Sequence, residues 1–227
     1  MLISVIIPVL NEAGFIRPCL AQFVDEIDIE VVVVDGGSSD ATMAIVGEYQ
    51  HVRGVVSPTA GRASQMNYAV GHTTGLALLF LHADTRLPEN GLQLIRQALV
   101  SEGVVGGRFK LALSERGIRF WLIGRLSTLR SRLFGITYGD QGIFVRRSVF
   151  EAVGGYPRMD LFEDSEFCKE VSRHGKFVTA NGRVLSSTRR WRSWGILRTV
   201  TWMWALRILF TLGVSDKTLS RWYRAVR

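Results

Sequence analysis

We predict that this chain of 227 residues folds as an α/β domain, with a mostly parallel central sheet flanked by helices. Two observations predict this class. Short runs of β-branched and other apolar residues, each bounded by turn residues, are typical of strands buried on both faces. Stretches of helical length lie between these runs, and strands that alternate with helices are joined by right-handed crossovers in a mostly parallel sheet.

The strand signal occurs four times in the first hundred residues. The apolar runs are Ser4–Pro8, Val31–Val34, Val55–Val56 and Leu79–Leu81. Each run gives way to a polar loop, and these loops are Asn11-Glu12, Asp35–Asp40, Ser57-Pro58 and His82–Thr85. In open α/β sheets the loops at the carboxyl ends of the strands line the ligand-binding crevice. We therefore expect these loops to contribute to one site.

Three predicted helices lie among these strands. They cover Ala13–Val24, which has apolar residues at helical spacing, Ala41–Tyr49, which follows a candidate cap at Asp40, and Arg62–Val70. Further along the chain, Ile143–Val145 has the composition of another strand. The first hundred residues are therefore predicted to form a nucleotide-binding half.

The composition, with 47% hydrophobic and 21% charged residues, allows one sizeable core or two small subdomains that share a sheet. We find neither a linker nor a low-complexity tract, so one domain over residues 1–227 is expected. Cys19 and Cys168 are far apart and lack metal-ligand spacing, which argues against a disulfide framework and a zinc site. The chain enters a strand without a secretory signal, and we expect a cytoplasmic location.

The positive charge of the chain is concentrated in its last part. The segment Arg183–Arg227 contains ten Lys or Arg residues and one acid, Asp216, and so accounts for all of the formal net charge of +8. Five of the six tryptophans lie in the same segment. Tryptophan together with arginine is found where proteins meet lipid headgroups or another anionic partner. An anionic membrane surface is therefore a candidate partner, with peripheral attachment to the inner face of the membrane.

The segment Ile196–Val214 is mostly apolar but is not predicted to span a bilayer. Arg198 and Arg207 interrupt it, and a charge near the middle of a bilayer costs at least ~2.5 kcal/mol. These two arginines also fall on opposite faces of a continuous helix, whereas a helix lying on a membrane segregates its charges. The alternatives are a helix packed against the body, peripheral membrane contact and nucleic-acid contact, of which we do not expect the last.

Two of the polar loops carry side chains suited to a nucleotide. The Asp35 carboxylate can accept a hydrogen bond from a base N–H or a ribose hydroxyl, and the neighbouring glycines allow close approach of the backbone. The alternative for Asp35–Asp40 is a turn that ends in a helix cap. Arg62 lies near the start of a predicted helix, where the helix dipole and the guanidinium both favour a phosphate. The alternative for Arg62 is a solvated surface charge.

The order of the motifs carries more information than any one of them. The six segments are Ile6–Glu12, Val33–Thr42, Gly61–Asn67, Leu81–Thr85, Gly139–Gly142 and Phe162–Asp164. In this order the sequence resembles the family 2 glycosyltransferases of GT-A fold, from about Ser4 to about Arg190. The resemblance implies a nucleotide-sugar-binding half over residues 1–100, an acceptor-binding and catalytic half over 101–190, and a basic, tryptophan-rich helical tail over 191–227.

The resemblance also implies roles for individual residues on the donor side. Pro8, Glu12 and Asp35 match positions that hold the donor's nucleoside, and Arg62 matches a basic position that approaches it. Asp84 matches the last aspartate of the family's metal motif, where Mg²⁺ or Mn²⁺ bridges the diphosphate.

Two positions depart from the family's donor-side pattern. His82 replaces the first aspartate of the metal motif, and it can ligate Mn²⁺, donate to a phosphate or ribose, or fill space. Gly36 replaces the second aspartate of the family's Val-Asp-Asp-Gly-Ser pattern, and this replacement weakens any detailed expectation about ribose contacts.

On the acceptor side, Asp164 matches the catalytic base, which takes the proton of the attacking hydroxyl, and Glu163 is expected to assist. The alternative is that the acids here only stabilise the start of a helix. Asp140 and Gln141 are candidates for contact with the donor sugar or acceptor, with a tight turn as the alternative. Arg116–Arg132 suits a lid or a surface for a lipid-linked acceptor, but we favour a helix with its charges outside and its aromatic residues inside.

These expectations together describe a metal-dependent, inverting glycosyltransferase. It would move one sugar from a nucleotide-diphosphate sugar, with UDP favoured over GDP, to a hydroxyl acceptor in polysaccharide or glycolipid biosynthesis. One alternative is a nucleotidyltransferase of related architecture, although no glycine-rich loop containing arginine follows the first strand. The other is a non-catalytic scaffold that binds anionic lipid or nucleic acid through the tail.

Overall fold

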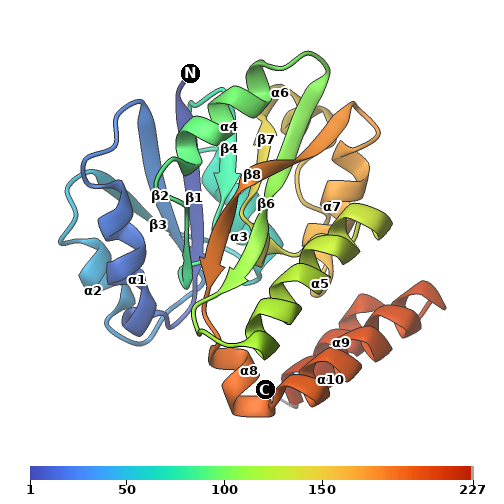
Figure 1. Cartoon of the computed structure of the whole chain (residues 1–227). Helices are drawn as coiled ribbons and strands as arrows, with labels where there is room; N and C mark the ends of the chain where they lie inside the picture. The colour runs from blue at the N-terminus through green and yellow to red at the C-terminus, as the bar shows by residue number, and fades with distance from the viewer. Residues whose placement is uncertain (226–227) are drawn as a thin grey trace.

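The computed structural model describes residues 1–225 and contains an eight-stranded sheet with helices on both faces (Figure 1). The sheet order is β3-β2-β1-β4-β7-β6-β8-β5. The strands are β1 (Ile3–Val9), β2 (Ile29–Asp35), β3 (Val52–Val56), β4 (Ala77–Phe80), β5 (Thr85–Arg86), β6 (Val104–Leu113), β7 (Ile143–Arg146) and β8 (Lys176–Ser186). The four predicted strands of the first hundred residues are thus present, and together with the strand at Ile143–Val145 they belong to a single sheet.

The helical elements connect and cover these strands. They are α1 (Ala13–Leu20), the 3₁₀ turn η1 (Ala21–Phe23), α2 (Thr42–Val46), α3 (Arg62–Val70), α4 (Gly91–Val100), α5 (Ile118–Phe134), the 3₁₀ turn η2 (Gly139–Gln141), α6 (Arg147–Ala152), α7 (Glu163–Val171), α8 (Arg189–Trp194), α9 (Ile196–Thr211) and α10 (Asp216–Ala225). The predicted helix Arg62–Val70 is confirmed in full, and α2 is shorter than the predicted Ala41–Tyr49.

The prediction of a mostly parallel sheet flanked by helices is confirmed. Strands β3, β2, β1 and β4 are parallel neighbours, and β6 is parallel to β8. The other pairs are antiparallel, because β7 runs against β4 and β6, and β5 runs against β8. The parallel strands place the ends of β1, β2 and β4 at one edge of the sheet.

Alternate residues of the central strands enter two separate cores, one on each face of the sheet. In β1, Ile3, Val5 and Ile7 join a core that also contains residues of α1, α4 and α5, whereas Ile6 joins a second core with residues of α3 and α7. Successive side chains of a strand point to opposite faces. This two-sided burial explains why the runs are apolar throughout instead of alternating with polar residues.

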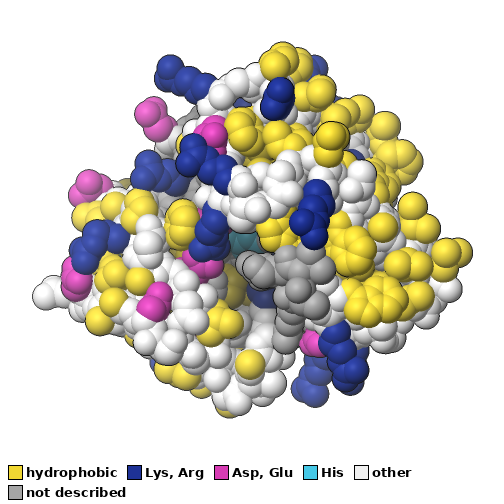
Figure 2. Space-filling model, turned by 90° about the horizontal axis from the view of Figure 1, so that it is seen from below, with side chains coloured by type: hydrophobic (Ala, Val, Ile, Leu, Met, Phe, Trp, Pro, Cys, Tyr) yellow, Lys and Arg dark blue, Asp and Glu magenta, His cyan; other side chains and the backbone are white. Residues whose placement is uncertain are grey.

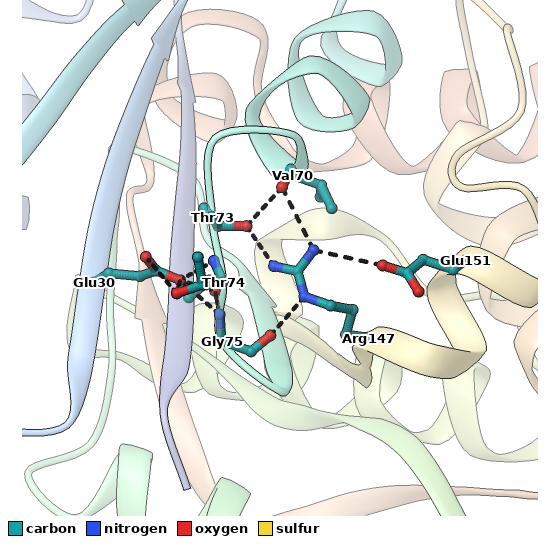
Figure 3. Close-up of polar contacts among 8 residues, drawn as sticks. Glu30, Val70, Thr73, Thr74, Gly75, Arg147 and Glu151 are labelled. Carbon is teal, nitrogen blue, oxygen red and sulfur yellow. Dashed lines mark hydrogen bonds and ion pairs between the residues drawn. The ribbon is translucent and has the colours of Figure 1, made fainter.

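A network of hydrogen bonds closes the amino-terminal edge of the sheet (Figure 3). Arg147 at the start of α6 donates to the Gly75 carbonyl at 2.7 Å and to the Thr73 hydroxyl at 2.6 Å, and its guanidinium lies 3.7 Å from Glu151. Glu30 accepts hydrogen bonds from the backbone N–H groups of Thr74 and Gly75 at 2.6 and 2.7 Å. These contacts pair the polar groups of this edge with one another.

The tail packs on the body through α9 and α10. Leu206 and Leu219 are fully buried together with Phe162, the residue that precedes α7. Arg207 donates to Glu166 at 3.1 Å and lies over the ring of Phe162, so it points towards the body instead of reaching out to water. The face of the tail that carries Leu206, Arg207 and Leu219 is therefore packed against the body, as one of the alternatives above proposed. Val226 and Arg227, the end of the predicted tail, lie outside the described residues.

Within residues 1–225, no helix has both the length and the hydropathy needed to cross a membrane. The helix over Arg116–Arg132 differs from the arrangement that we favoured. Its hydrophobic residues Trp121, Leu122 and Leu126 are exposed, and its buried residues include Gly124 and Ser127. The prediction of aromatic residues inside is therefore wrong for Trp121, whereas Phe120 packs against the core beside the buried Ile123.

Candidate active site

The predicted site loops follow the carboxyl ends of β1, β2 and β4, at the lower edge of the sheet in Figure 1. Figure 2 looks onto this edge and shows a hollow with a histidine side chain inside it, and with basic and acidic side chains at its margin. The Asp40 carboxylate ties two of the loops together, since it accepts from the N–H groups of Thr42 at 3.0 Å and Ala13 at 3.1 Å. It thereby holds the first turns of α1 and α2 beside each other.

One side of the site is an ion-pair cluster centred on Arg189. Its guanidinium donates two hydrogen bonds to the Glu12 carboxylate, at 2.9 and 3.0 Å, and lies 3.9 Å from the carboxylate of Asp84. It also lies 4.5 Å above the ring of Phe15. The hydrogen bonds that Arg189 donates to Glu12 raise the pKa of Arg189, so the side chain stays charged. Sequence reasoning did not place Arg189 in the site, although it noted the basic character of its segment.

Asp84 lies in the loop after β4 and its side chain is 20% exposed. Its backbone carbonyl accepts from the N–H of Ser187 at 3.1 Å, which fixes the loop against the residue that follows β8. Among residues 1–225, no group of three or more His, Cys, Asp or Glu side chains could enclose a metal ion. A single partly exposed carboxylate still fits Mg²⁺ or a similar ion, since such ions are often held by one or two carboxylates together with water and substrate phosphates.

The loop that carries His82 meets the segment that carries Asp164 at Gly139. The N–H of Gly139 donates to Asp164 Oδ2 at 2.8 Å. A Cβ atom at Gly139 would lie 2.4 Å from His82 Nε2 and 2.8 Å from Asp164 Oδ2, which is closer than real Cβ contacts. The missing side chain of Gly139 therefore allows the imidazole and the carboxylate to approach the same point. Three of the six motifs converge here.

Asp164 and Glu163 are both buried at the start of α7 and share one cation. Arg62 at the start of α3 lies 3.4 Å from Glu163 and 3.5 Å from Asp164. Burial and, to a lesser extent, the charge of Glu163 raise the pKa of Asp164, Arg62 opposes the shift, and the resulting pKa is about 7. Arg62 thus pairs with the two predicted catalytic acids and is more than a solvated surface charge.

The backbone before these acids has an uncommon conformation. Phe162 has φ 70° and ψ 12°, in the left-handed region that bulky residues seldom adopt. Its side chain is 3% exposed and packs against Leu206 of α9 and Leu219 of α10. Tertiary packing stabilises such a conformation only where several contacts fix the residue. The tail therefore supports the segment that presents Glu163 and Asp164.

Asp35 is 4% exposed, and its carboxylate accepts hydrogen bonds from its own loop. The donors are the N–H of Gly37 at 3.1 Å, the N–H of Ser38 at 2.9 Å and the hydroxyl of Ser38 at 2.5 Å. The turn that we considered as an alternative is thus present. A contact between Asp35 and a nucleoside stays a prediction.

Gly36 has a structural partner in Gln65 of α3. A Cβ atom at Gly36 would lie 3.0 Å from the Gln65 side chain. The Gln65 amide nitrogen donates to the carbonyls of Val9 and Val34, both at 2.9 Å, and so joins the ends of β1 and β2. The place of the second aspartate of the family pattern is therefore taken by a buried amide that links two strands.

Two predicted donor-binding residues lie away from the open part of the site. Pro8 is half-buried within β1, where it pairs in register with Val34 of β2. Gln141 has no exposed surface, and its amide nitrogen donates to Ser131 at 3.2 Å and to the Phe109 carbonyl at 3.3 Å. In this structure Gln141 lies beneath the site and joins η2 to α5 and β6.

Comparison with known proteins identifies relatives of the chain. Residues 4–154 match the model of glycosyl transferase family 2. A PGL/p-HBAD biosynthesis glycosyltransferase of Mycobacterium bovis is 32% identical over 161 residues, which are 67% of this chain and 62% of the relative. The probable glycosyltransferase YdaM of Bacillus subtilis is 26% identical over 225 residues, 87% of this chain and 53% of the relative. The chain thus spans between half and two thirds of the length of these relatives.

Solved structures share the fold. The mannosyltransferase PcManGT from Pyrobaculum calidifontis, in complex with GDP-Man and Mn²⁺, superposes with a TM-score of 0.66 at 23% identity, covering 81% of this chain and 56% of the other. S. aureus TarS 1-349 in complex with UDP-GlcNAc gives 0.64 at 20% identity, with 82% and 58% covered. These likenesses show the GT-A fold, and the family match, which covers more than half of the sequence, shows that the chain belongs to glycosyl transferase family 2.

Proposed function

We propose that this protein transfers one sugar from a nucleotide-diphosphate sugar to a hydroxyl acceptor, with inversion at the anomeric carbon. The observation that carries the proposal is the convergence at Gly139, where the loop of His82 and Asp84 meets the buried carboxylate of Asp164. A residue suited to the leaving diphosphate and a residue suited to the attacking hydroxyl thus belong to segments that meet at one residue. Such positioning accounts for a large part of the catalysis of a two-substrate reaction.

On the donor side, Asp84 would hold Mg²⁺ or Mn²⁺, and the bound ion supplies positive charge to the departing diphosphate. Glu12, Asp35 and Arg62 are proposed to contact the nucleotide, and His82 is proposed to contact the ion or a phosphate. PcManGT is complexed with GDP-Man and Mn²⁺, and a glucosyl-3-phosphoglycerate synthase from Mycobacterium tuberculosis is complexed with Mn²⁺ and UDP. We favour a UDP-sugar donor because uridine nucleotides also occupy TarS.

On the acceptor side, Asp164 accepts the proton of the attacking hydroxyl. The acceptor oxygen forms a bond to the anomeric carbon as the bond from that carbon to the diphosphate oxygen breaks, and the electron pair leaves with the diphosphate. A base on the face opposite the leaving group gives inversion. A pKa of about 7 suits this role, since a base works best with a pKa close to the working pH. Glu163 raises that pKa, and Arg62 limits the rise.

Ligand-induced thermal stabilisation tests the proposal. UDP together with Mn²⁺ should raise the melting temperature by mass action, and either one alone should raise it less. Asp84→Asn should abolish the joint effect, whereas Asp25→Asn, at an exposed acid elsewhere, should keep it. GDP in place of UDP distinguishes the two donors. If Asp84→Asn gave the same shift as the native protein, Asp84 would have no part in metal-assisted donor binding.

A further inference from the structure

Helix α5 presents its large apolar side chains to the solvent. Ile118, Leu122, Leu126, Leu129 and Leu133 recur every three or four residues, so they form one stripe along the helix. Each is between 48% and 74% exposed. A helix on the surface of a water-soluble domain normally turns such a stripe towards the core. The stripe is therefore not used for folding.

The other face of α5 explains this orientation. Its buried residues are Ile123 and the small residues Gly124, Ser127 and Ser131, and it rests on β6. A Cβ atom at Gly124 would lie 2.7 Å from the Leu111 carbonyl oxygen, so the helix backbone lies directly on the strand. The leucines cannot enter this contact without pushing the helix off the sheet.

Helix α9 carries a second exposed stripe. Leu197, Trp204 and Ile208, with Leu212 directly after the helix, again follow helical spacing, and each is at least 43% exposed. The two helices approach each other where Arg130 of α5 and Met203 of α9 line one small crevice. Hydrophobic side chains gather along one side of the molecule in Figure 2, on the side where α5, α9 and α10 lie in Figure 1. We call the two stripes together the α5–α9 face.

Positive charge surrounds the α5–α9 face. Exposed basic residues lie on all three helices, at Arg119, Arg125, Arg132, Arg198, Lys217 and Arg221. The sequences of α5, α9 and α10 contain one acid, Asp216, and its carboxylate accepts a hydrogen bond from the N–H of Asp160. Arg125 also lies 4.8 Å from the ring of Trp121. A partner that binds this face should therefore carry negative charge.

We propose that the α5–α9 face docks on the surface of an anionic lipid bilayer, with its leucine and tryptophan side chains at the boundary between headgroups and acyl chains. Apolar residues flanked by Lys and Arg are the composition of interfacial helices. A second copy of the chain is a poorer match, because a symmetric contact would place arginines against arginines. Nucleic acid would pair with the arginines but has no use for a stripe of leucines, since bases stack on aromatic rings.

The position of this face also bears on the acceptor, and this part rests on the proposed function. Helices α9 and α10 pack directly on Phe162, the residue that precedes Glu163 and Asp164. A bilayer in contact with α5 and α9 would lie on the same side of the molecule as the segment that carries the base. The acceptor class that suits this arrangement is a hydroxyl compound with a lipid anchor.

Vesicle flotation tests the docking surface. The native protein should float with vesicles of phosphatidylcholine and phosphatidylglycerol at about 50 mM NaCl and much less at about 500 mM NaCl, because salt screens the arginines. The variant Leu122→Ser/Leu126→Ser/Leu129→Ser should bind at least tenfold more weakly. A matched control is Ile27→Ser/Leu76→Ser/Val100→Ser, which removes exposed apolar side chains elsewhere and should bind as the native protein does.

Three results would overturn the docking proposal. They are failure of the native protein to float with anionic vesicles at low salt, equal binding by the leucine variant, and formation of a dimer in sedimentation velocity that the leucine substitutions disrupt. Stabilisation by UDP and Mn²⁺, measured on the same leucine variant, separates this proposal from the proposed function. If the native protein bound vesicles but neither protein were stabilised by UDP and Mn²⁺, the docking proposal would stand and the proposed donor binding would fail. If both proteins were stabilised but the native protein did not bind vesicles, the proposed donor binding would stand and the docking proposal would fail.

Discussion

Arg189 and Glu12, which are 177 positions apart in the chain, form a two-point ion pair with distances of 2.9 and 3.0 Å. The same guanidinium lies 3.9 Å from Asp84. Glu12 ends the loop after β1, Asp84 lies in the loop after β4, and Arg189 begins α8 after β8. The arginine therefore supplies positive charge at the place where the proposed metal and nucleotide would bind, and it links three loops of the site.

The first prediction concerns competition between this arginine and a metal ion. In Arg189→Ala the carboxylates of Glu12 and Asp84 lose a positive neighbour, so Mn²⁺ alone should bind more tightly. The expected gain is up to ~5-fold, which corresponds to the upper range of ~1 kcal/mol for an exposed ion pair. Titration followed by the electron paramagnetic resonance signal of free Mn²⁺ measures it. Arg192→Ala, which removes the exposed pair with Glu115, is the control. Weaker Mn²⁺ binding by Arg189→Ala would contradict the prediction.

The second prediction concerns the close approach at Gly139. In Gly139→Ala the added methyl group must displace His82 or Asp164, and we expect transfer activity to fall by at least ~10-fold, because small displacements of reacting groups are costly. The fold should persist, since the clash is local. Gly14→Ala, in α1 with no atom within 4 Å of the new Cβ, should keep full activity and unfold at the same or a higher temperature. Unchanged turnover in Gly139→Ala would show that the two side chains need not meet there.

The third prediction concerns the dependence of stability on pH. Burial raises the pKa of Asp164 above its unfolded value to about 7, so the folded state binds an additional proton between about pH 4 and about pH 7. The free energy of unfolding should therefore fall as the pH rises through this range. Asp164→Asn lacks the buried charge and should be more stable than the native protein at about pH 8, with little difference at about pH 4.

Urea unfolding of the protein without ligands at both pH values measures this effect. A shift of one pKa unit corresponds to ~1.4 kcal/mol, and the expected gain at the higher pH is at least of that size. Asp160→Asn, at an exposed acid just before the same segment, should show no comparable gain. A variant that is less stable than the native protein at the higher pH would indicate that Arg62 compensates fully for burial of the charge.

The fourth prediction concerns the amide that joins β1 to β2. Gln65→Met keeps the approximate volume but loses both hydrogen bonds to the carbonyls of Val9 and Val34. We expect the free energy of unfolding to fall by about 1–3 kcal/mol. Gln93→Met, on the exposed side of α4, should change it by less than ~0.5 kcal/mol. Equal stability of the two variants would mean that the buried amide contributes nothing to the joint between the strands.

Local sequence determined the elements of the amino-terminal half. The runs at β1 and β2 are apolar and β-branched over a length suited to strands, and α3 begins and ends where the sequence predicted. It also determined the order of the motifs, and a parallel arrangement carries their loops to one edge of the sheet. These features depend on residues that are neighbours in the chain, so their pattern can be read without coordinates.

Only the tertiary structure decided which distant residues meet. The pairing of Arg189 with Glu12, the approach of His82 and Asp164 at Gly139 and the partnership of Gly36 with Gln65 join separate segments. The outward stripe of α5 depends in the same way on how close the helix lies to the sheet. The small residues at Gly124, Ser127 and Ser131 carried the signal, but the prediction for this helix considered only its charged and aromatic residues. The distance between a helix and the sheet that it packs on determines which face of the helix can be buried. That distance is set only when the chain folds.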